Sequence, residues 1–221
     1  MTQRNPALER NRLAAEVAEF TRGRVPRAIR RRQVLAIATE LFIERGFTEA
    51  SMDELARRVG VSKPVIYDLF GSKEALFGEV VAQQAQALAD AVQAATDAER
   101  DPEKRLHAGA LAFFRFAEER REAWHALLSA DAAPVNAELA AARRFHASQV
   151  ASMLARGAAD LGSEADPVLL DACAQAINGA FEALAAWWKE HPELSAEMLA
   201  TLGAGLMQPG LRAFVELKKK R

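Results

Sequence analysis

Apolar residues recur every three or four positions along most of the chain, which is the spacing of amphipathic helices. Glycines, prolines and N-capping residues divide this pattern into segments. In the first third of the chain we predict four helices, at residues 26–45, 51–58, 62–70 and 72–95. Further helices are predicted at 102–121, 122–129, 134–161, 166–190 and 195–217, the last with a kink at Pro209-Gly210.

The helix boundaries rest on local signals. Gly46 ends the first helix, and Ser51-Met52-Asp53-Glu54 has the pattern of a capping box that begins the second. Gly60 lies where a left-handed turn residue is needed, and Ser62 is placed to cap the third helix. Two short helices joined by a tight turn that contains glycine predict a helix-turn-helix.

Composition agrees with a helical protein and excludes several classes. The chain has 221 residues, with 12 Gly, 8 Pro and frequent alanine, so we predict an all-α fold. The single cysteine, Cys173, and four histidines without ligand spacing predict no metal site. No catalytic pattern or phosphate-binding loop is recognisable, so we expect neither an enzyme nor a cofactor. Without a signal peptide or an apolar run of about 18 residues, we expect a cytoplasmic protein with no membrane partner.

Charge is divided unevenly along the chain, although the net charge is only −1. Residues 1–73 hold 14 basic and 9 acidic residues, a balance of +5, so the remainder carries −6. A basic front indicates a polyanionic partner. Six arginines fall within residues 22–32: Arg22, Arg24, Arg27, Arg30, Arg31 and Arg32. A solvated basic face is the alternative to DNA contact for this group.

The predicted helix-turn-helix has an inward and an outward side. Its core positions are Leu55, Ala56, Val59, Val61, Ile66, Leu69 and Phe70. The outward-facing residues of its second helix are Lys63, Pro64, Val65, Tyr67 and Asp68. A helix-turn-helix places the second helix in the major groove of DNA.

The same residues resemble a known family. The run Gly60-Val61-Ser62-Lys63-Pro64-Val65-Ile66-Tyr67-Asp68-Leu69-Phe70-Gly71-Ser72-Lys73, followed by Glu74-Ala75-Leu76-Phe77, resembles the DNA-binding signature of TetR-type transcriptional regulators. The resemblance extends back through Leu41–Phe47 and Ser51–Ala56. It implies an N-terminal three-helix head and a C-terminal helical bundle for ligand binding and dimerisation. We therefore expect a flexible basic arm at 1–25, a DNA-binding domain at 26–80 and a ligand-binding and dimerisation domain at 81–221.

The resemblance also implies which residues contact DNA. Lys63 begins the recognition helix, Pro64 and Val65 match positions that touch thymine methyls, and Tyr67 and Lys73 match phosphate contacts. Leu69 departs from the family, which commonly has His or Tyr there and an added phosphate contact. The expected DNA-binding set is Ser51, Met52, Ser62, Lys63, Pro64, Val65, Tyr67, Lys73, Arg22, Arg24 and Arg27.

Two further sets belong to the second domain. The expected lining of an effector pocket is Phe113, Phe114, Phe116, Trp124, Phe145, Met153 and Phe181, although aromatic and Met residues at helical spacing also serve as plain core. The expected dimer interface is Ala176, Ala180, Leu184, Trp187, Leu202 and Leu206, with packing inside one chain as the alternative.

Together these features predict a homodimeric regulator, a repressor, that binds a palindromic operator on double-stranded DNA and responds to a small, largely apolar effector. One alternative is a helical small-molecule-binding or scaffolding protein without affinity for duplex DNA. A second is an enzyme with a helical core, for which the sequence offers no catalytic set.

Overall fold

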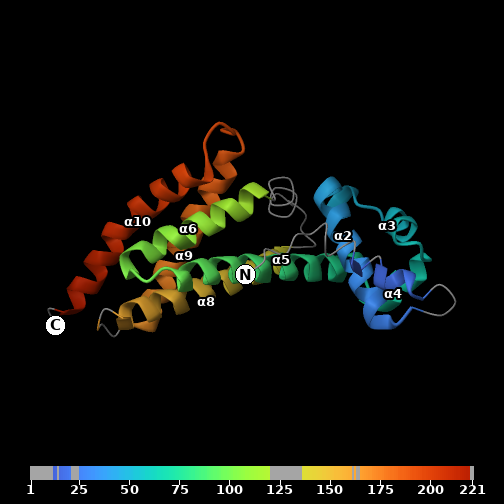
Figure 1. Cartoon of the computed structure of the whole chain (residues 1–221), viewed down its shortest axis with the longest axis horizontal. Coiled ribbons are helices and arrows are strands. Elements are labelled where there is room, and N and C mark those ends of the chain that lie inside the picture. Colours follow the sequence, from blue (N-terminus) through green and yellow to red (C-terminus); the bar gives the residue numbers. More distant parts are fainter. Residues whose placement is uncertain are drawn as a thin grey trace. The chain divides into compact units, whose positions relative to one another are not determined.

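The computed structural model describes residues 12–13, 15–20, 25–119, 136–160, 162 and 165–219. These residues are largely helical and include no strand, which confirms the all-α prediction. The chain divides into two compact units (Figure 1). One comprises Met1–Ala82 with Glu122–Glu138, and the other comprises Gln83–Arg121 with Leu139–Arg221.

In its described part, the first unit includes α2 (Arg27–Glu49), α3 (Met52–Val59), α4 (Lys63–Phe70) and the first turns of α5 (Lys73–Ala98). Gly46 interrupts α2 as predicted, because its φ of 70° and ψ of 175° are not helical. The three residues after it still belong to the helical segment, which ends at Glu49. Such a positive φ favours glycine, which has no Cβ.

Two of the three serines that precede helices in this unit act as side-chain caps. The Ser51 hydroxyl accepts a hydrogen bond from the Asp53 N–H at 3.2 Å, and the Ser72 hydroxyl accepts one from the Ala75 N–H at 3.0 Å. Ser62 stands at the N-cap of α4 but its side chain makes no capping hydrogen bond. The expectation that Ser62 caps this helix is therefore wrong, and its hydroxyl remains on an exposed residue.

Aromatic rings fill the core of the first unit. Phe42 and Phe77 are almost completely buried and meet edge to face, with ring centres 5.1 Å apart. Phe47 packs on both rings and connects the end of α2 to α5. Ile66 holds α4 against this core with a completely buried side chain. Full burial of each large apolar side chain contributes about 1.5–3 kcal/mol, so this core fixes the orientation of the short helices.

The second unit contains most of α5, together with α6 (Pro102–Glu119), nearly all of α8 (Asn136–Asp160), α9 (Pro167–Trp188) and α10 (Ala196–Lys219). Helix α10 packs along α6 and α9, as Figure 1 shows. Helix α10 continues through Pro209 to Lys219. The helix predicted at 122–129 lies outside the described residues.

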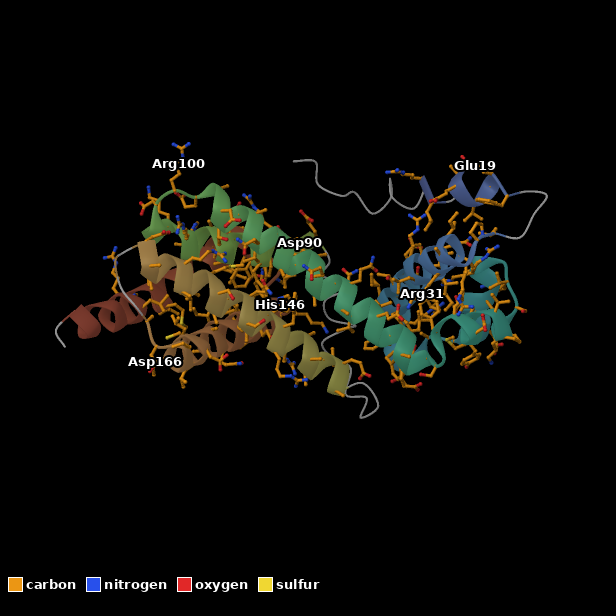
Figure 2. All side chains as sticks on the ribbon, turned by 90° about the horizontal axis from the view of Figure 1, so that it is seen from below. Glu19, Arg31, Asp90, Arg100, His146 and Asp166 are labelled. Carbon is orange, nitrogen blue, oxygen red and sulfur yellow. The ribbon has the colours of Figure 1, made fainter. Side chains whose placement is uncertain are left out.

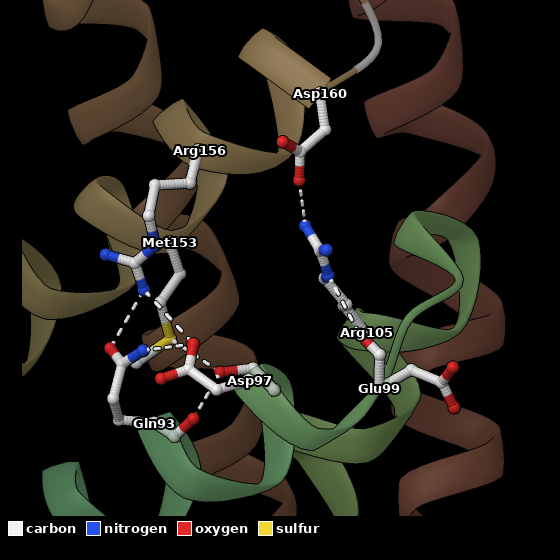
Figure 3. Close-up of polar contacts among 8 residues, drawn as sticks. Gln93, Asp97, Glu99, Arg105, Met153, Arg156 and Asp160 are labelled. Atoms are coloured by element: carbon white, nitrogen blue, oxygen red, sulfur yellow. Dashed lines mark hydrogen bonds and ion pairs between the residues drawn. The ribbon is translucent and has the colours of Figure 1, made fainter.

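Polar contacts join α5, α6 and α8 inside the second unit (Figure 3). The Arg156 guanidinium of α8 donates to the Gln93 amide oxygen of α5 at 2.9 Å, and Arg105 of α6 pairs with Asp160 of α8. Arg105 also donates to the Glu99 carbonyl at 3.1 Å. These contacts fix the relative positions of three helix ends around the start of α6.

Helix α9 departs from one expectation. Among the described helices it alone is long and apolar enough to cross a membrane, judged by length and composition only, with a mean hydropathy of 1.2 over 18 residues. The sequence shows no unbroken apolar run of that length, because Asp171 and Glu182 interrupt it. Only 28% of this window is buried, so α9 leaves an apolar face uncovered in the single chain.

Candidate nucleic-acid interface

The turn between α3 and α4 is built by Gly60. Its φ of 76° and ψ of 37° are left-handed, and its N–H donates to the Ala56 carbonyl at 2.9 Å. The Val61 N–H donates to the same carbonyl at 3.0 Å, which closes the turn tightly. Two short helices therefore cross at a fixed angle around the small side chain of Ala56, as a helix-turn-helix requires.

Helix α4 buries one side and exposes the other. Ile66 and Phe70 lie in the core, at 0% and 7% exposure. Pro64, Val65 and Tyr67 are exposed, and both Val65 and Tyr67 retain 38% exposure. Large apolar and aromatic side chains on the surface of so small a helix are uncovered in the free chain. They are available to contact base edges and sugar-phosphate backbone.

Lys63, at the start of α4, is already engaged by an acid. Its ammonium donates to the Asp53 carboxylate of α3 at 3.0 Å, and this hydrogen bond raises the pKa of Lys63. Both side chains remain substantially exposed, at 41% and 76%. Asp53 was not among the residues expected at the interface; its position as the second residue of α3, beside the cap at Ser51, is the only signal for it in the sequence.

Met52 requires a correction. Its side chain is only 7% exposed, because the first residue of α3 turns toward the core of the head. A buried methionine cannot present its side chain to DNA, so we remove Met52 from the expected interface. Ser51 and Ser62 beside it remain exposed.

Lys73 is the first residue of α5, and its side chain contacts the end of α2. Its ammonium is 4.6 Å from the centre of the Phe47 ring and donates to the Thr48 carbonyl at 3.3 Å. Partial burial lowers the pKa of Lys73. A cation over an aromatic face is held in place by the ring quadrupole, so this charge is anchored next to the N-terminus of α5.

Three arginines of the cluster have partners within the chain, although the side chains of Arg31 and Arg32 stay 42% and 59% exposed. Arg31 of α2 pairs with Glu79 of α5 and stacks over the Phe70 ring at 4.7 Å, and Figure 2 shows it among the side chains of the head. Arg32 donates to both oxygens of Glu16 at 2.6 and 2.7 Å. Arg30 donates to Gln33. All three of these arginines therefore have hydrogen-bond or ion-pair partners within the chain.

Arg27 remains at the edge of the α4 surface. Its guanidinium forms a fork on Asp68 of α4: Nη1 donates to the carboxylate, and Nη2 donates to the backbone carbonyl at 2.8 Å. Arg22 and Arg24 lie outside the described residues. Arg27 therefore ties α2 to the exposed side of α4.

The expected pocket residues fall into separate places in the second unit. Phe113, Phe114 and Phe181 form one aromatic cluster, with ring centres 5.1–5.8 Å apart, and Trp188 packs on it. Phe116 is buried on the same helix, α6. Met153 lies against Thr96, with its sulfur 3.8 Å from the hydroxyl, and the Phe145 ring faces His146. Trp124 lies outside the described residues.

The expected dimer residues line the outer faces of α9 and α10. Trp187, Leu202 and Leu206 retain 46%, 48% and 64% exposure. Ala176 is exposed and Ala180 partly so. Leu184 is half-buried and packs near Gly203 of α10 within the same chain.

The fold and this surface define a helix-turn-helix protein with a separate helical domain, and the comparisons identify its family. Residues 34–80 match the family described as bacterial regulatory proteins, tetR family, and residues 102–207 match the tetracyclin repressor-like C-terminal domain. The chain therefore belongs to the TetR family of bacterial regulatory proteins. It is a DNA-binding transcriptional regulator and not an enzyme.

Relatives of known name agree with this assignment. The HTH-type transcriptional activator FasR of Mycolicibacterium smegmatis is 40% identical over 108 residues, which are 49% of each chain. The HTH-type transcriptional regulator BetI 2 of Chromohalobacter salexigens is 36% identical over 83 residues, 38% of this chain and 40% of BetI 2. The chain thus matches half or less of the length of these two curated relatives.

Two solved structures show how far the fold is shared. A TetR-like regulator from Rhodococcus sp. RHA1 has a TM-score of 0.62 and 28% identity, covering 86% of this chain and 99% of its own. FadR from Bacillus subtilis, solved in complex with stearoyl-CoA, has a TM-score of 0.68. At 14% identity, with 81% of this chain and 98% of FadR covered, that second likeness is one of fold alone.

Proposed function

We propose that the protein binds a palindromic operator as a homodimer, represses transcription there, and releases the DNA when a small, largely apolar effector binds. In this proposal residues 1–25 form a basic arm, 26–80 bind DNA, and 81–221 bind the effector and the second copy. The observation that carries it is the outward surface of α4, where Lys63, Val65 and Tyr67 stand exposed.

The chemistry of that surface fits a major groove. The apolar Pro64 and Val65 match thymine methyl groups, and the Tyr67 hydroxyl is a donor for a phosphate oxygen. Lys73 supplies a cation beside the N-terminus of α5, where the positive end of the helix dipole attracts phosphate. The set proposed for DNA contact is Ser51, Ser62, Lys63, Pro64, Val65, Tyr67 and Lys73, with Arg22 and Arg24 of the arm.

In this proposal a second copy of the chain packs against the exposed faces of α9 and α10. Trp187, Leu202 and Leu206 expose close to half or more of their surface. The small side chains of Ala176 and Ala180 allow helices of two copies to approach closely. Two heads related by a twofold axis would read half-sites about 34–36 Å apart, which one short helix cannot do alone.

The effector proposal rests on the aromatic cluster of Phe113, Phe114 and Phe181. Rings that meet edge to face offer an apolar wall for a ligand. The fold is shared with FadR, which was solved in complex with stearoyl-CoA, a ligand with a long apolar chain. An effector that prefers a conformer with badly spaced heads would weaken operator binding by its differential affinity.

FasR supports activation as a second candidate, because it is named an activator and shares 40% identity over 108 residues. One measurement distinguishes repression from activation. In a strain that carries the operator upstream of a reporter, deletion of the regulator raises expression if it represses and lowers expression if it activates.

Selection of DNA from a random duplex library by the purified protein tests the proposal. We expect a palindrome with half-sites one helical turn apart. Lys63→Ala combined with Tyr67→Ala should abolish binding to it and leave the helical circular dichroism unchanged. Lys73→Ala should weaken all sequences alike and lower the salt slope by about one. If no sequence is enriched, or the double variant binds like the wild type, the proposal is wrong.

A further inference from the structure

An acid stands at the most outward position of α4. Successive residues of an α-helix are about 100° apart, so a residue two places from both Ile66 and Phe70 lies opposite them. That residue is Asp68. Ile66 and Phe70 are buried, whereas the Asp68 side chain is 68% exposed. If α4 enters a groove, Asp68 projects toward its floor.

Arg27 holds this carboxylate in one orientation. Its Nη1 donates to Asp68 Oδ2, and its Nη2 donates to the Asp68 backbone carbonyl at 2.8 Å. A two-point fork fixes direction better than a single contact. Within the described part of the chain, no hydrogen-bond donor meets the other carboxylate oxygen, Oδ1. Among the described residues, one acceptor atom is thus held in place without a donor at the outer face of the helix.

A carboxylate in a groove makes a strong chemical selection. It accepts hydrogen bonds and donates none, and it is repelled by the acceptor atoms of guanine and thymine. Adenine offers an amino group with the N7 acceptor beside it. This pair of groups suits an amide, which has both a donor and an acceptor, better than a carboxylate, which has acceptors only. Cytosine presents its N4 amino group as the only polar group on its major-groove edge. Cytosine is therefore the base that best satisfies Oδ1.

We propose that Asp68 is a specificity-determining residue that accepts a hydrogen bond from the N4 amino group of a cytosine in each half-site. Arg27 is its positioning residue, which orients the carboxylate and offsets its repulsion from nearby phosphates. This inference rests on the proposed placement of α4 in the major groove. For this reason we leave Arg27 out of the proposed DNA contacts, although the sequence placed it among them: its donors are directed to Asp68.

The test is binding-site selection from a random duplex library with the wild type, Asp68→Ala and Asp68→Asn. The wild type should require cytosine at one position of each half-site. Asp68→Ala should lose this preference, which amounts to about 5- to 150-fold against other bases, and keep the remaining motif. Asp68→Asn should shift the preference to adenine. Asp90→Asn, which neutralises an exposed acid of α5 in the second unit, is the matched control and should leave the motif unchanged.

Arg27→Gln tests the positioning role. It should reduce discrimination at the same cytosine position, and in the Asp68→Ala background it should have no further effect there. A general loss of folding would instead alter every position and the circular dichroism. The inference is overturned if Asp68→Ala selects the wild-type motif, or if the affected position prefers adenine, guanine or thymine in the wild type. A wild type that selects no motif overturns the proposed function itself, and this inference with it.

Discussion

The apolar surface of α10 gives a quantitative prediction for self-association. Leu202 is 48% exposed in the single chain. Complete burial of a leucine contributes about 1.5–3 kcal/mol, so covering the exposed half contributes about 1 kcal/mol. A twofold interface contains the residue twice, once from each copy. Leu202 therefore stabilises the proposed dimer by about 2 kcal/mol, and Leu202→Glu removes this and adds two facing carboxylates.

We expect Leu202→Glu to raise the dimer dissociation constant by at least about 30-fold, which is the equivalent of 2 kcal/mol. Sedimentation equilibrium over a range of protein concentrations measures this constant directly. Gln83→Glu introduces the same charge at an exposed position of α5 and is the matched control. Circular dichroism should show both variants as helical as the wild type.

Leu202→Ala separates the two contributions to this effect. It removes most of the apolar contact without adding charge, so its dissociation constant should lie between those of the wild type and Leu202→Glu. The reasoning fails if Leu202→Glu dimerises as tightly as Gln83→Glu, because the exposed face of α10 would then not be the interface. A monomeric wild type would contradict it equally.

Two other predictions concern the second unit. A Cβ added at Gly203 would lie 2.8 Å from Cε1 of Phe181, so Gly203→Ala should lower the free energy of unfolding by about 1–3 kcal/mol. Gly205 has open space around it, so Gly205→Ala should raise the free energy of unfolding by about 0.4–1 kcal/mol. Urea unfolding measures both values, and equal effects of the two substitutions would contradict the packing of Gly203 against Phe181. Burial lowers the pKa of His146, so protonation of this imidazole favours the unfolded chain. The free energy of unfolding should therefore be unaffected by His146 above the ordinary histidine pKa of about 6.5, and should decline as the pH falls below it. Urea midpoints at about pH 8 and about pH 5 should differ less in His146→Gln than in the wild type, and an identical difference would show that another group is responsible.

Local signals in the sequence were enough to find the helices. The cap at Ser51 and the glycines at 46 and 60 act over a few residues, so their consequences are readable from neighbouring letters. Ser62 shows the limit of this approach, because the same residue type at an N-cap need not turn its hydroxyl to the helix. The orientation of Met52 depended on the core that α3 meets, which no local pattern contains.

The ion-pair partners of the arginine cluster could not be read from the sequence for a related reason. Spacing alone made its members equivalent, yet Arg31 pairs with Glu79, 48 residues away, and Arg32 with Glu16. Arg31 and Glu79 become neighbours only after α2 and α5 have packed. The charge balance of +5 was a sound guide to the partner of the head, but it could not say which cations face that partner.

The ion pairs on the outer face of the head also bear on how it can bind DNA. Lys63 and Asp53 are both well exposed, and pairs in water contribute little net free energy because solvent screens them. Lys63 can therefore exchange Asp53 for a phosphate or a base acceptor at small cost. The released Asp53 carboxylate would then stand beside DNA without a cation, which opposes binding wherever Lys63 finds no good acceptor. If α4 binds the operator as proposed, the paired acids Asp53 and Asp68 should weaken binding to arbitrary sequences more than binding to the operator, and so favour specificity over affinity.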